Sequence, residues 1–185
     1  MAALATLDQL EAVCGPQADE AAALAALDQA TTALQAATNQ WLLPVAGDRV
    51  ILDPEGADTL LLPELPVTAV GAVVVEGVAL SPAEYEWSGS GILRMVGAYG
   101  CGPNFPRRLA SVDVTYDHGY EPTPADLSLA CAHMACRILS GGSSSGPMVD
   151  GVPITAERVG SYSVSYAQGL SYAESVVVDR YRVGP

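Results

Sequence analysis

The stretch DVTYDHGYEPTPADL, residues 113–127, decides the fold because the hydrophobic pattern changes there from that of a strand to that of a helix. Just upstream, Val112, Val114 and Tyr116 alternate with polar residues, as expected of a strand with one buried face. Gly119 can then supply the flexible backbone that a turn needs. We therefore expect the last strand of a β lobe to end here and a helix to begin after the turn.

A helix start follows in EPTPADLSLACAHMACRILS. Thr123 is the expected N-cap, Pro124 the first helical residue, where its missing N–H costs nothing, and Asp126 the acid of a capping box. The helix is expected over about 124–140, and apolar side chains surround most of it. Such a helix is buried on most sides, and in a chain this small one of those sides could face a neighbouring subunit.

The residues before this stretch predict a small antiparallel β lobe over about 44–120. DRVILD and DTLLLPELPVTAV are short extended pieces, and Pro63 and Pro66 make the second an edge segment or an entry arm rather than a central strand. AVVVEGVAL predicts a hairpin that turns at Glu76 and Gly77, since glycine readily adopts the positive φ of such turns. EYEWSGSGILRM predicts another hairpin around its central SGSG.

The N-terminal part predicts two helices, a short one over residues 4–13 and a longer one over about 18–40. The apolar stripe of the longer helix comprises Leu24, Leu27, Thr31, Leu34 and Trp41. Its opposite face is small and uncharged and consists of Ala22, Ala26, Gln29, Ala33, Ala36 and Gln40. Because an exposed helix face usually carries charges, this face suits the close approach of another helix.

The C-terminal part begins with GGSSSGP and predicts a flexible loop over 141–153. Two interpretations stay open: a mobile loop that orders on assembly, or a passive linker. ITAERVGSYSVSYA then shows strand alternation, and Ser171 with Glu174 forms a capping box for a last helix over about 171–182. The sequence thus predicts an α+β fold, in which a small helical core and an inserted β lobe form a single domain over 1–185.

Charge is unevenly distributed along the chain. The net charge is -13, lysine is absent, and the first 92 residues hold thirteen acids against Arg49 alone. The remaining residues hold eight acids against seven arginines. An acidic surface repels phosphate backbones, which argues against specific binding of nucleic acid. Solubility alone would also explain such a balance.

The sequence also excludes several classes of protein. No apolar run approaches the 18 or so residues that span a bilayer, and the N-terminus lacks the basic segment of a secretory signal. The four cysteines form no C-x-x-C pair, so we expect reduced thiols in a cytoplasm and no structural zinc.

The candidates for chemistry are weak. Asp117 and His118 are adjacent in an expected strand, so their side chains point to opposite sides and cannot easily act on one substrate atom. Cys131, His133 and Cys136 diverge around a helix, so one metal ion cannot collect all three. We therefore predict no enzyme and no catalytic, cofactor or metal site.

Several segments together resemble the head-tail adaptor (connector) proteins of long-tailed double-stranded DNA bacteriophages and prophages. They are LLLPELPVTAVGAVVVEGVALSPAEYEW with GILRM, VDVTYDHGYEPTPADLSLACAHMACRIL, ERVGSYSVSYA and AESVVVDRYR, in that order. The resemblance covers roughly Leu60 to Arg182. Val176 to Val178 depart from it, because such proteins more usually have leucine and alanine there.

The resemblance implies a structural protein of the virion neck, assembled in the bacterial host cytoplasm. Its subunits would form a homo-oligomeric ring, typically of twelve, that docks under the portal and offers a platform for a stopper or tail-side protein. Genomic DNA would pass through the ring without specific binding, and no membrane would be involved. The residues expected at ring or partner interfaces are Ala22, Ala26, Ala33, Arg137, Tyr172, Arg180, Tyr181 and Arg182.

Two alternatives belong to other classes. A stopper or tail-completion protein would form a sixfold ring on the tail side. A small hydrolase would use Asp117 and His118. Within the adaptor interpretation, the helices at 18–40 and 124–140 would form the core and lateral contacts, and the segment from about Ser171 to Pro185 would reach the portal.

Overall fold

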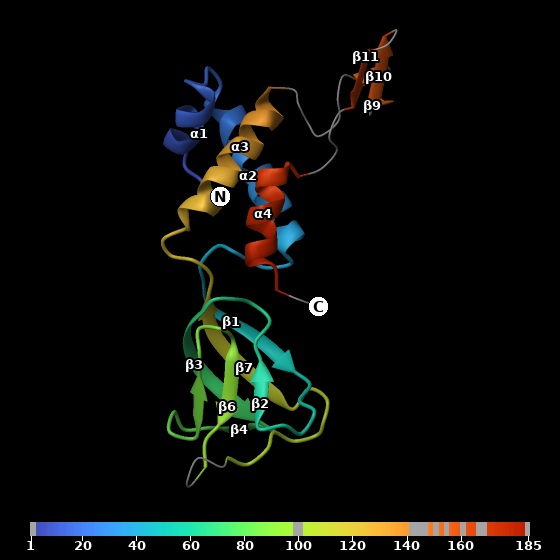
Figure 1. Ribbon diagram of the computed structural model, residues 1–185. Coiled ribbons are helices and arrows are strands. Elements are labelled where there is room, and N and C mark those ends of the chain that lie inside the picture. The colour runs from blue at the N-terminus through green and yellow to red at the C-terminus, as the bar shows by residue number, and fades with distance from the viewer. Residues whose placement is uncertain are drawn as a thin grey trace. The chain divides into compact units, whose positions relative to one another are not determined.

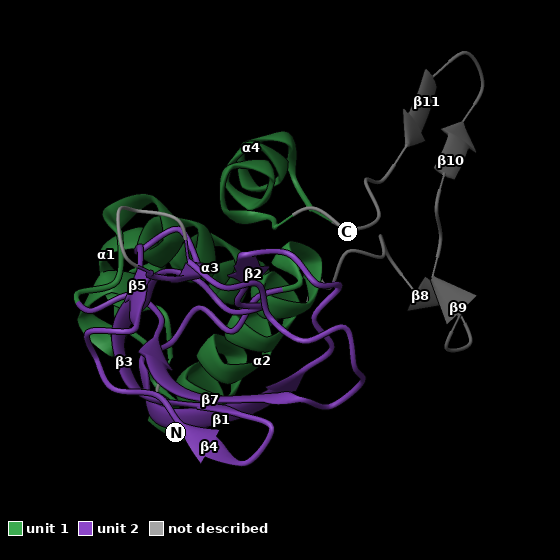
Figure 2. Ribbon diagram, turned by 90° about the horizontal axis from the view of Figure 1, so that it is seen from below, with its two compact units in different colours: residues 1–39, 122–185 green, residues 40–121 purple. Residues whose placement is uncertain are grey.

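The computed structural model describes residues 3–97, 102–140, 148–149, 152–153, 156–159, 162–165 and 170–183 of the chain. It divides into two compact units. Unit 1 combines residues 1–39 with 122–185, and unit 2 comprises residues 40–121 (Figure 2). Unit 1 is helical and unit 2 is built from antiparallel strands, so the predicted α+β class is confirmed.

The described part of unit 1 contains four helices: α1 (Leu7–Cys14), α2 (Glu20–Thr38), α3 (Ala125–Leu139) and α4 (Tyr172–Tyr181) (Figure 1). The last three confirm the helices expected at about 18–40, 124–140 and 171–182, with ends within about two residues. Helix α3 packs against each of the other three. The side chains of this unit that are almost completely buried include Leu10, Ala23, Leu27, Ala30, Leu34, Leu127, Cys131, Ala135 and Val178.

The N-terminus of α3 differs from the prediction. Pro124, not Thr123, occupies the N-cap, and no side chain caps the helix there. The Asp126 carboxylate instead accepts a hydrogen bond from the Tyr181 hydroxyl of α4. The prediction of a capping box was therefore wrong, because the Asp126 carboxylate that it requires contacts helix α4 instead.

A disulfide joins Cys14 at the end of α1 to Cys136 in α3, with their Cα atoms 5.7 Å apart. The expectation that all thiols are reduced is wrong for this pair. Sequence spacing could not reveal it, because the two cysteines are 122 residues apart and meet only through the packing of α1 on α3. Cys131 is free and buried, and burial raises the pKa of its thiol.

Unit 2 contains a four-stranded antiparallel sheet in the order β1 (Val45–Leu52), β7 (Val112–His118), β3 (Val67–Val75) and β4 (Val78–Ala79). The turn at Glu76 and Gly77 between β3 and β4 is as predicted, with positive φ at both residues. Strand β3 lies inside the strand order, but β4 pairs only with its Val74 and Val75. The residues of β3 that belong to the predicted segment, Val67–Val70, pair only with β7 among the described strands, as expected of an edge or entry segment. The prolines at 63 and 66 precede β3 and leave its N–H groups free to pair.

A second sheet of unit 2 has the order β2 (Thr59–Leu61), β6 (Ile92–Met95) and β5 (Tyr85–Trp87). The predicted SGSG hairpin is the β5–β6 connection. Buried side chains of both sheets form one core, which comprises Leu62, Val67, Val73, Tyr85, Leu93, Phe105, Val112, Val114 and Tyr116. The expected face of β7 is thus the buried one.

Between α3 and α4, β8 (Met148–Val149) pairs with β9 (Val152–Pro153) and β10 (Ala156–Val159) with β11 (Tyr162–Ser165). Most of the loop expected over 141–153 lies outside the described residues. Within the described part of the chain, no helix has the length and apolar character that crossing a membrane requires.

Candidate assembly surfaces

A buried carboxylate attaches α4 to α3. Glu174 of α4 forms a two-pronged ion pair with Arg137 of α3, and the Arg137 Nη2 to Glu174 Oε2 distance is 2.9 Å. Its Oε2 also accepts the Ser171 N–H at 2.7 Å, which completes the predicted capping box. Burial tends to raise the pKa of Glu174, but these hydrogen bonds and the Arg137 charge outweigh it and hold the pKa below its usual value.

A second carboxylate holds the other end of α4. Asp126 of α3 accepts hydrogen bonds from Arg180 Nη1 at 2.6 Å and from the Tyr181 hydroxyl at 2.7 Å. Burial opposes ionisation of Asp126, yet these donors, together with the Leu127 N–H, keep its pKa below the usual range. Of the described α4 residues, only Glu174 and Val178 are buried, so polar contacts supply much of its attachment.

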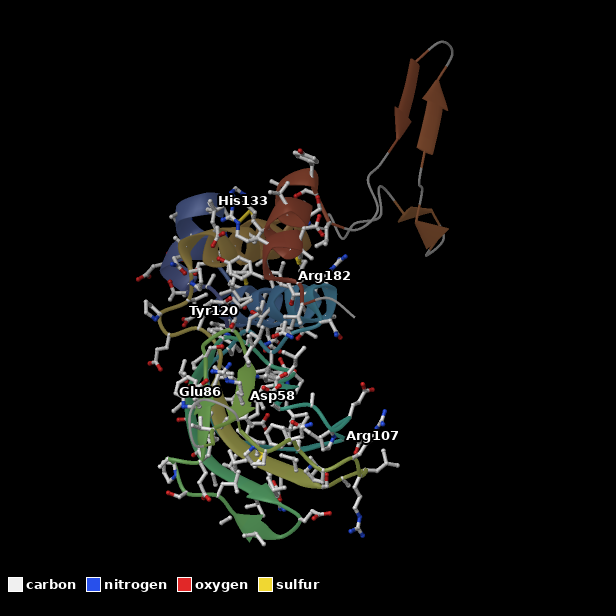
Figure 3. All side chains as sticks on the ribbon, turned by 60° about the horizontal axis from the view of Figure 1, so that its bottom comes forward. Asp58, Glu86, Arg107, Tyr120, His133 and Arg182 are labelled. Atoms are coloured by element: carbon white, nitrogen blue, oxygen red, sulfur yellow. A yellow bond between two sulfur atoms is a disulfide. The ribbon has the colours of Figure 1, made fainter. Side chains whose placement is uncertain are left out.

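These pairs leave the arginines on the outside. Arg137 is 38% exposed against 2% for Glu174, and Arg180 is 65% exposed against 29% for Asp126. Arg182 extends from the end of α4 and donates to the Ala37 carbonyl at 3.3 Å (Figure 3). Arg137 and Arg180 are therefore more exposed than the carboxylates that they pair with, whereas Asp179, whose Oδ1 lies 3.8 Å from Arg182 Nη1, is itself 70% exposed.

A groove of about 370 Å³ lies between α3 and α4. Its apolar lining includes Leu129, Ala130 and Val177, and Arg137 is among its polar residues. Tyr172, at the first turn of α4, is 86% exposed, and Leu129 and Val176 are also exposed. This surface combines apolar side chains with arginine, a composition that is typical of protein interfaces.

A second groove, of about 530 Å³, lies along the start of the chain and α2. Ala5, Leu7, Leu24 and Leu27 line it, with Asp28 at its side. Leu24 is 50% exposed, although its helical spacing predicted a place on the apolar stripe. Leu27, Thr31 and Leu34 of the predicted stripe are buried, but Leu24 and Trp41 are about half exposed, because the buried face of α2 begins at Ala23 and the helix ends before Trp41.

The structure distributes the predicted interface residues over several parts of unit 1. Ala22 and Ala33 are exposed on α2, whereas Ala26 is buried inside unit 1. Arg137 lies on α3, Tyr172, Arg180 and Tyr181 lie on α4, and Arg182 follows directly after α4. Gln40, expected on the small face of the long helix, belongs to unit 2 and is buried there.

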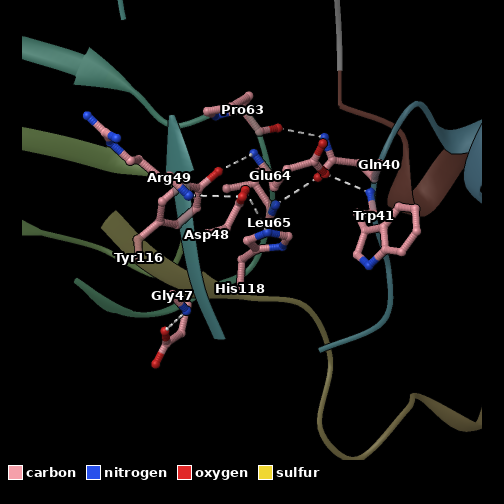
Figure 4. A network of polar contacts seen from close by, with 11 residues as sticks. Gln40, Trp41, Gly47, Asp48, Arg49, Pro63, Glu64, Leu65, Tyr116 and His118 are labelled. Atoms are coloured by element: carbon pink, nitrogen blue, oxygen red, sulfur yellow. Dashed lines mark hydrogen bonds and ion pairs between the residues drawn. The ribbon is translucent and has the colours of Figure 1, made fainter. Parts of the chain in front are cut away.

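The Gln40 side chain forms hydrogen bonds with the loop at residues 63–65 of unit 2 (Figure 4). Its side-chain amide donates to the Pro63 carbonyl and accepts from the Leu65 N–H, both at 2.8 Å. The Trp41 N–H donates to the Glu64 carboxylate at 2.6 Å. These bonds explain why the predicted helix ends before Gln40: its amide pairs with backbone groups that the loop would otherwise leave unsatisfied.

Asp117 and His118 point to opposite faces of β7, as predicted. The Asp117 carboxylate accepts the Gly47 N–H at 2.7 Å on the outer face. The buried His118 lies with Nε2 3.3 Å from Asp48 Oδ2 (Figure 4). Next to it, burial raises the pKa of Tyr116 to about 12. The two residues thus support the turn and do not share a reacting atom.

The cysteine–histidine set is divided in the structure. Cys136 is in the disulfide, while the Cys131 sulfur faces α2, 3.5 Å from the Thr31 hydroxyl. Among the described residues, no group of three or more His, Cys, Asp or Glu side chains could hold a metal ion. Sequence reasoning also missed the contacts of Glu174 with Arg137 and of Asp126 with Arg180, for which the opposite charges of these side chains were the available signal.

The chain has an α+β fold. Both ends of the sequence form a helical unit, and a lobe of two sheets is inserted between them. This chain is similar to a chain in the neck of an empty gene transfer agent (GTA) particle computed with C6 symmetry. The TM-score is 0.62 at 19% identity, over 96% of this chain and 88% of that one. No family model and no curated protein matches the sequence.

Two related structures give the same result. A chain of the native GTA virion matches with a TM-score of 0.60 at 18% identity, over 96% of this chain and 88% of that one. A chain of the native GTA neck, computed with C12 symmetry, matches with a TM-score of 0.62 at 18% identity, over 97% and 88%. The resemblance noted in the sequence is thereby confirmed at the level of the fold.

Proposed function

We propose that this chain is a structural protein of a virion neck, and that it forms the head-tail adaptor ring between a DNA-filled head and a tail. The observation that carries the proposal is the match of nearly the whole chain to chains from GTA necks. Those necks were computed with C6 and C12 symmetry, which fits assembly of many copies around an axis.

In this ring, unit 1 would make the lateral contacts through α2 and the α3–α4 side. The segment from about Ser171 to the C-terminus would meet the portal, and a stopper or tail-side protein would bind the opposite face. A helix that is attached through a few ion pairs suits such a role, because docking can reposition it with little loss of apolar burial.

DNA would pass through the ring without specific binding. The net charge of -13 supports this, since an acidic wall repels phosphate and lets the duplex slide. Assembly would take place in the cytoplasm of a bacterial host, as the resemblance implies.

The test is to incubate the purified chain with portal rings of the same particle and to image the product by electron microscopy. An added layer under the portal is expected. A portal that gains no density after incubation with excess chain would contradict the adaptor role.

One of the similar GTA necks was computed with C6 symmetry, so a sixfold stopper or tail-completion protein is the second candidate. Native mass spectrometry of the assembled product separates the two, because the added mass is a multiple of the 19.0 kDa chain. Twelve copies on the portal support the adaptor, and six copies that bind only to a complex already carrying an adaptor support the stopper.

A further inference from the structure

We propose that neighbouring copies of this chain join head to tail. The groove beside α1 and α2 of one copy would receive the arginine-bearing α3–α4 surface of the next. The inference rests on the proposed ring and names the two surfaces that close it. They are called here the acidic surface, around Leu24 and Asp28, and the arginine surface, around Tyr172 and Arg180.

Asp28 lines the acidic surface, and the part of the chain that forms this surface, residues 1–39, carries charge of one sign. Residues 1–39 contain no arginine, lysine or histidine. Their five acids are Asp8, Glu11, Asp19, Glu20 and Asp28. All five belong to α1, to α2 or to the N-cap of α2, and no side-chain ion pair is found for any of them among the described residues.

The arginine surface has the complementary charge. Three arginines of unit 1, Arg137, Arg180 and Arg182, lie on or directly after α3 and α4, and Asp179 of α4 is an exposed acid beside Arg182. The carboxylates that pair with Arg137 and Arg180 are less exposed than the guanidinium groups. Since a guanidinium has five N–H donors and these pairs use only one or two, each arginine keeps donors for an acid of another copy.

Both surfaces contain exposed apolar side chains. Leu24 is half exposed beside its groove, and Tyr172, Leu129 and Val176 are exposed beside the other. An apolar centre with a charged rim is the usual anatomy of a protein interface. Both sides of the contact therefore offer area to bury as well as opposite charge.

The two surfaces lie on different sides of unit 1. Figures 1 and 2 show α1 and α4 on different sides of α3. A contact between two different surfaces leaves one of each free in a pair of copies, so further copies can add until a ring closes. A surface that paired only with itself would stop at two copies.

The experiment uses two full-length variants, each with one repulsive change at an exposed position. Leu24→Arg places a cation on the acidic surface, and Tyr172→Glu places an anion on the arginine surface. Both residues are exposed helical positions, so the fold should be kept, and circular dichroism checks that it is. Leu109→Arg, at an exposed position of unit 2, is the matched control.

Association is followed by sedimentation velocity up to about 1 mM chain. We expect each surface variant to weaken self-association at least about tenfold and the control to leave it unchanged. When the two surface variants are mixed, association should return, because one intact surface of each kind is then present. Raising the salt from about 0.1 M to 1 M should weaken wild-type association, since the screening length falls from about 10 Å to 3 Å.

Three results would overturn the inference: a wild type that stays monomeric, surface variants that associate like the control, or a mixture that fails to recover. In the last case the copies pair through identical surfaces. The proposed function has a separate readout, the layer on portal rings. A wild type that adds this layer while both surface variants add it equally well contradicts only the head-to-tail contact.

Discussion

At the scale of single residues, Glu174 has the largest consequence, because its carboxylate is almost fully buried and meets a partly exposed arginine. Removing one member of such a pair leaves the other without its partner and costs more than the pair itself contributes. The same carboxylate also caps the first turn of α4, so one side chain determines both where the helix begins and where it attaches.

Glu174→Ala should therefore lower the free energy of unfolding of unit 1 by about 2 kcal/mol, as measured by urea unfolding followed through the helical circular dichroism signal. Glu174→Gln keeps the cap geometry and should cost less. Glu55→Ala removes the same charge from an exposed site in unit 2 and should change stability by less than about 0.5 kcal/mol. Equal losses in all three variants would contradict the role given to Glu174.

Gly119, in the turn after β7, is constrained in two ways. Its φ is +95°, and a Cβ there would lie 2.2 Å from the Leu43 carbonyl oxygen. Gly119→Ala should destabilise unit 2 by about 2–4 kcal/mol, seen as a lower urea midpoint of the strand signal. Gly47→Ala is the matched control, because Gly47 also has a positive φ but no atom within 4 Å of its Cβ position. A loss of about 1 kcal/mol there isolates the backbone strain from the collision.

At the scale of elements, α4 differs from the other helices in depending on ionised carboxylates. The pKa values of Asp126 and Glu174 are lowered in the folded chain, from ordinary values of 3.8 and 4.5. The stability that they supply is therefore complete above the unfolded values and is lost as the pH falls through the folded ones.

We expect α4 to detach from α3 during acidification, roughly between pH 5 and pH 2, before α2 separates from α3. Among described contacts, α2 and α3 meet through apolar side chains and the Thr31–Cys131 contact, not through a carboxylate pair. NMR chemical shifts of the Val178 and Leu27 methyl groups would separate the two events. Val178 and Leu27 signals that change together at one pH would contradict this order.

The contribution of the Cys14–Cys136 disulfide to the stability of unit 1 can be tested. Replacing Cys14 and Cys136 together by serine should lower the stability of unit 1 by about 2–4 kcal/mol, because the crosslink restricts the unfolded chain. The midpoint of thermal unfolding, compared with and without reductant, measures the effect. The double variant should no longer respond to reductant, and a wild type that does not respond either would contradict the bond.

The sequence predicts local features of these elements better than their contacts. Hydrophobic periodicity predicts α2, α3 and α4, glycine-containing turns predict both hairpins, and a capping box predicts the start of α4, since these features depend on neighbours in the chain. The pairing of β3 with β7 and the Cys14–Cys136 bond depend on partners far along the chain. The charged and apolar residues of the two proposed surfaces can be named from the sequence. Their placement on different sides of unit 1 follows only from how its helices pack.

At the scale of the whole molecule, the acidic charge makes a prediction about DNA. With a net charge of -13, the chain should not retard duplex DNA in a gel at moderate salt, whether isolated or assembled. A shifted band that disappears at higher salt would mean that the surface holds a basic patch large enough to bind phosphate.

The course of the chain has one more consequence. Residues 40–121 interrupt unit 1, and the two ends of this segment meet, because the Tyr120 N–H donates to the Leu42 carbonyl at 3.1 Å. In genetic terms the β lobe is a cassette. It can be gained, exchanged or excised at two neighbouring points without altering the order of α1 to α4. The lobe can therefore vary in sequence while the packing of α1 to α4 within unit 1 is kept.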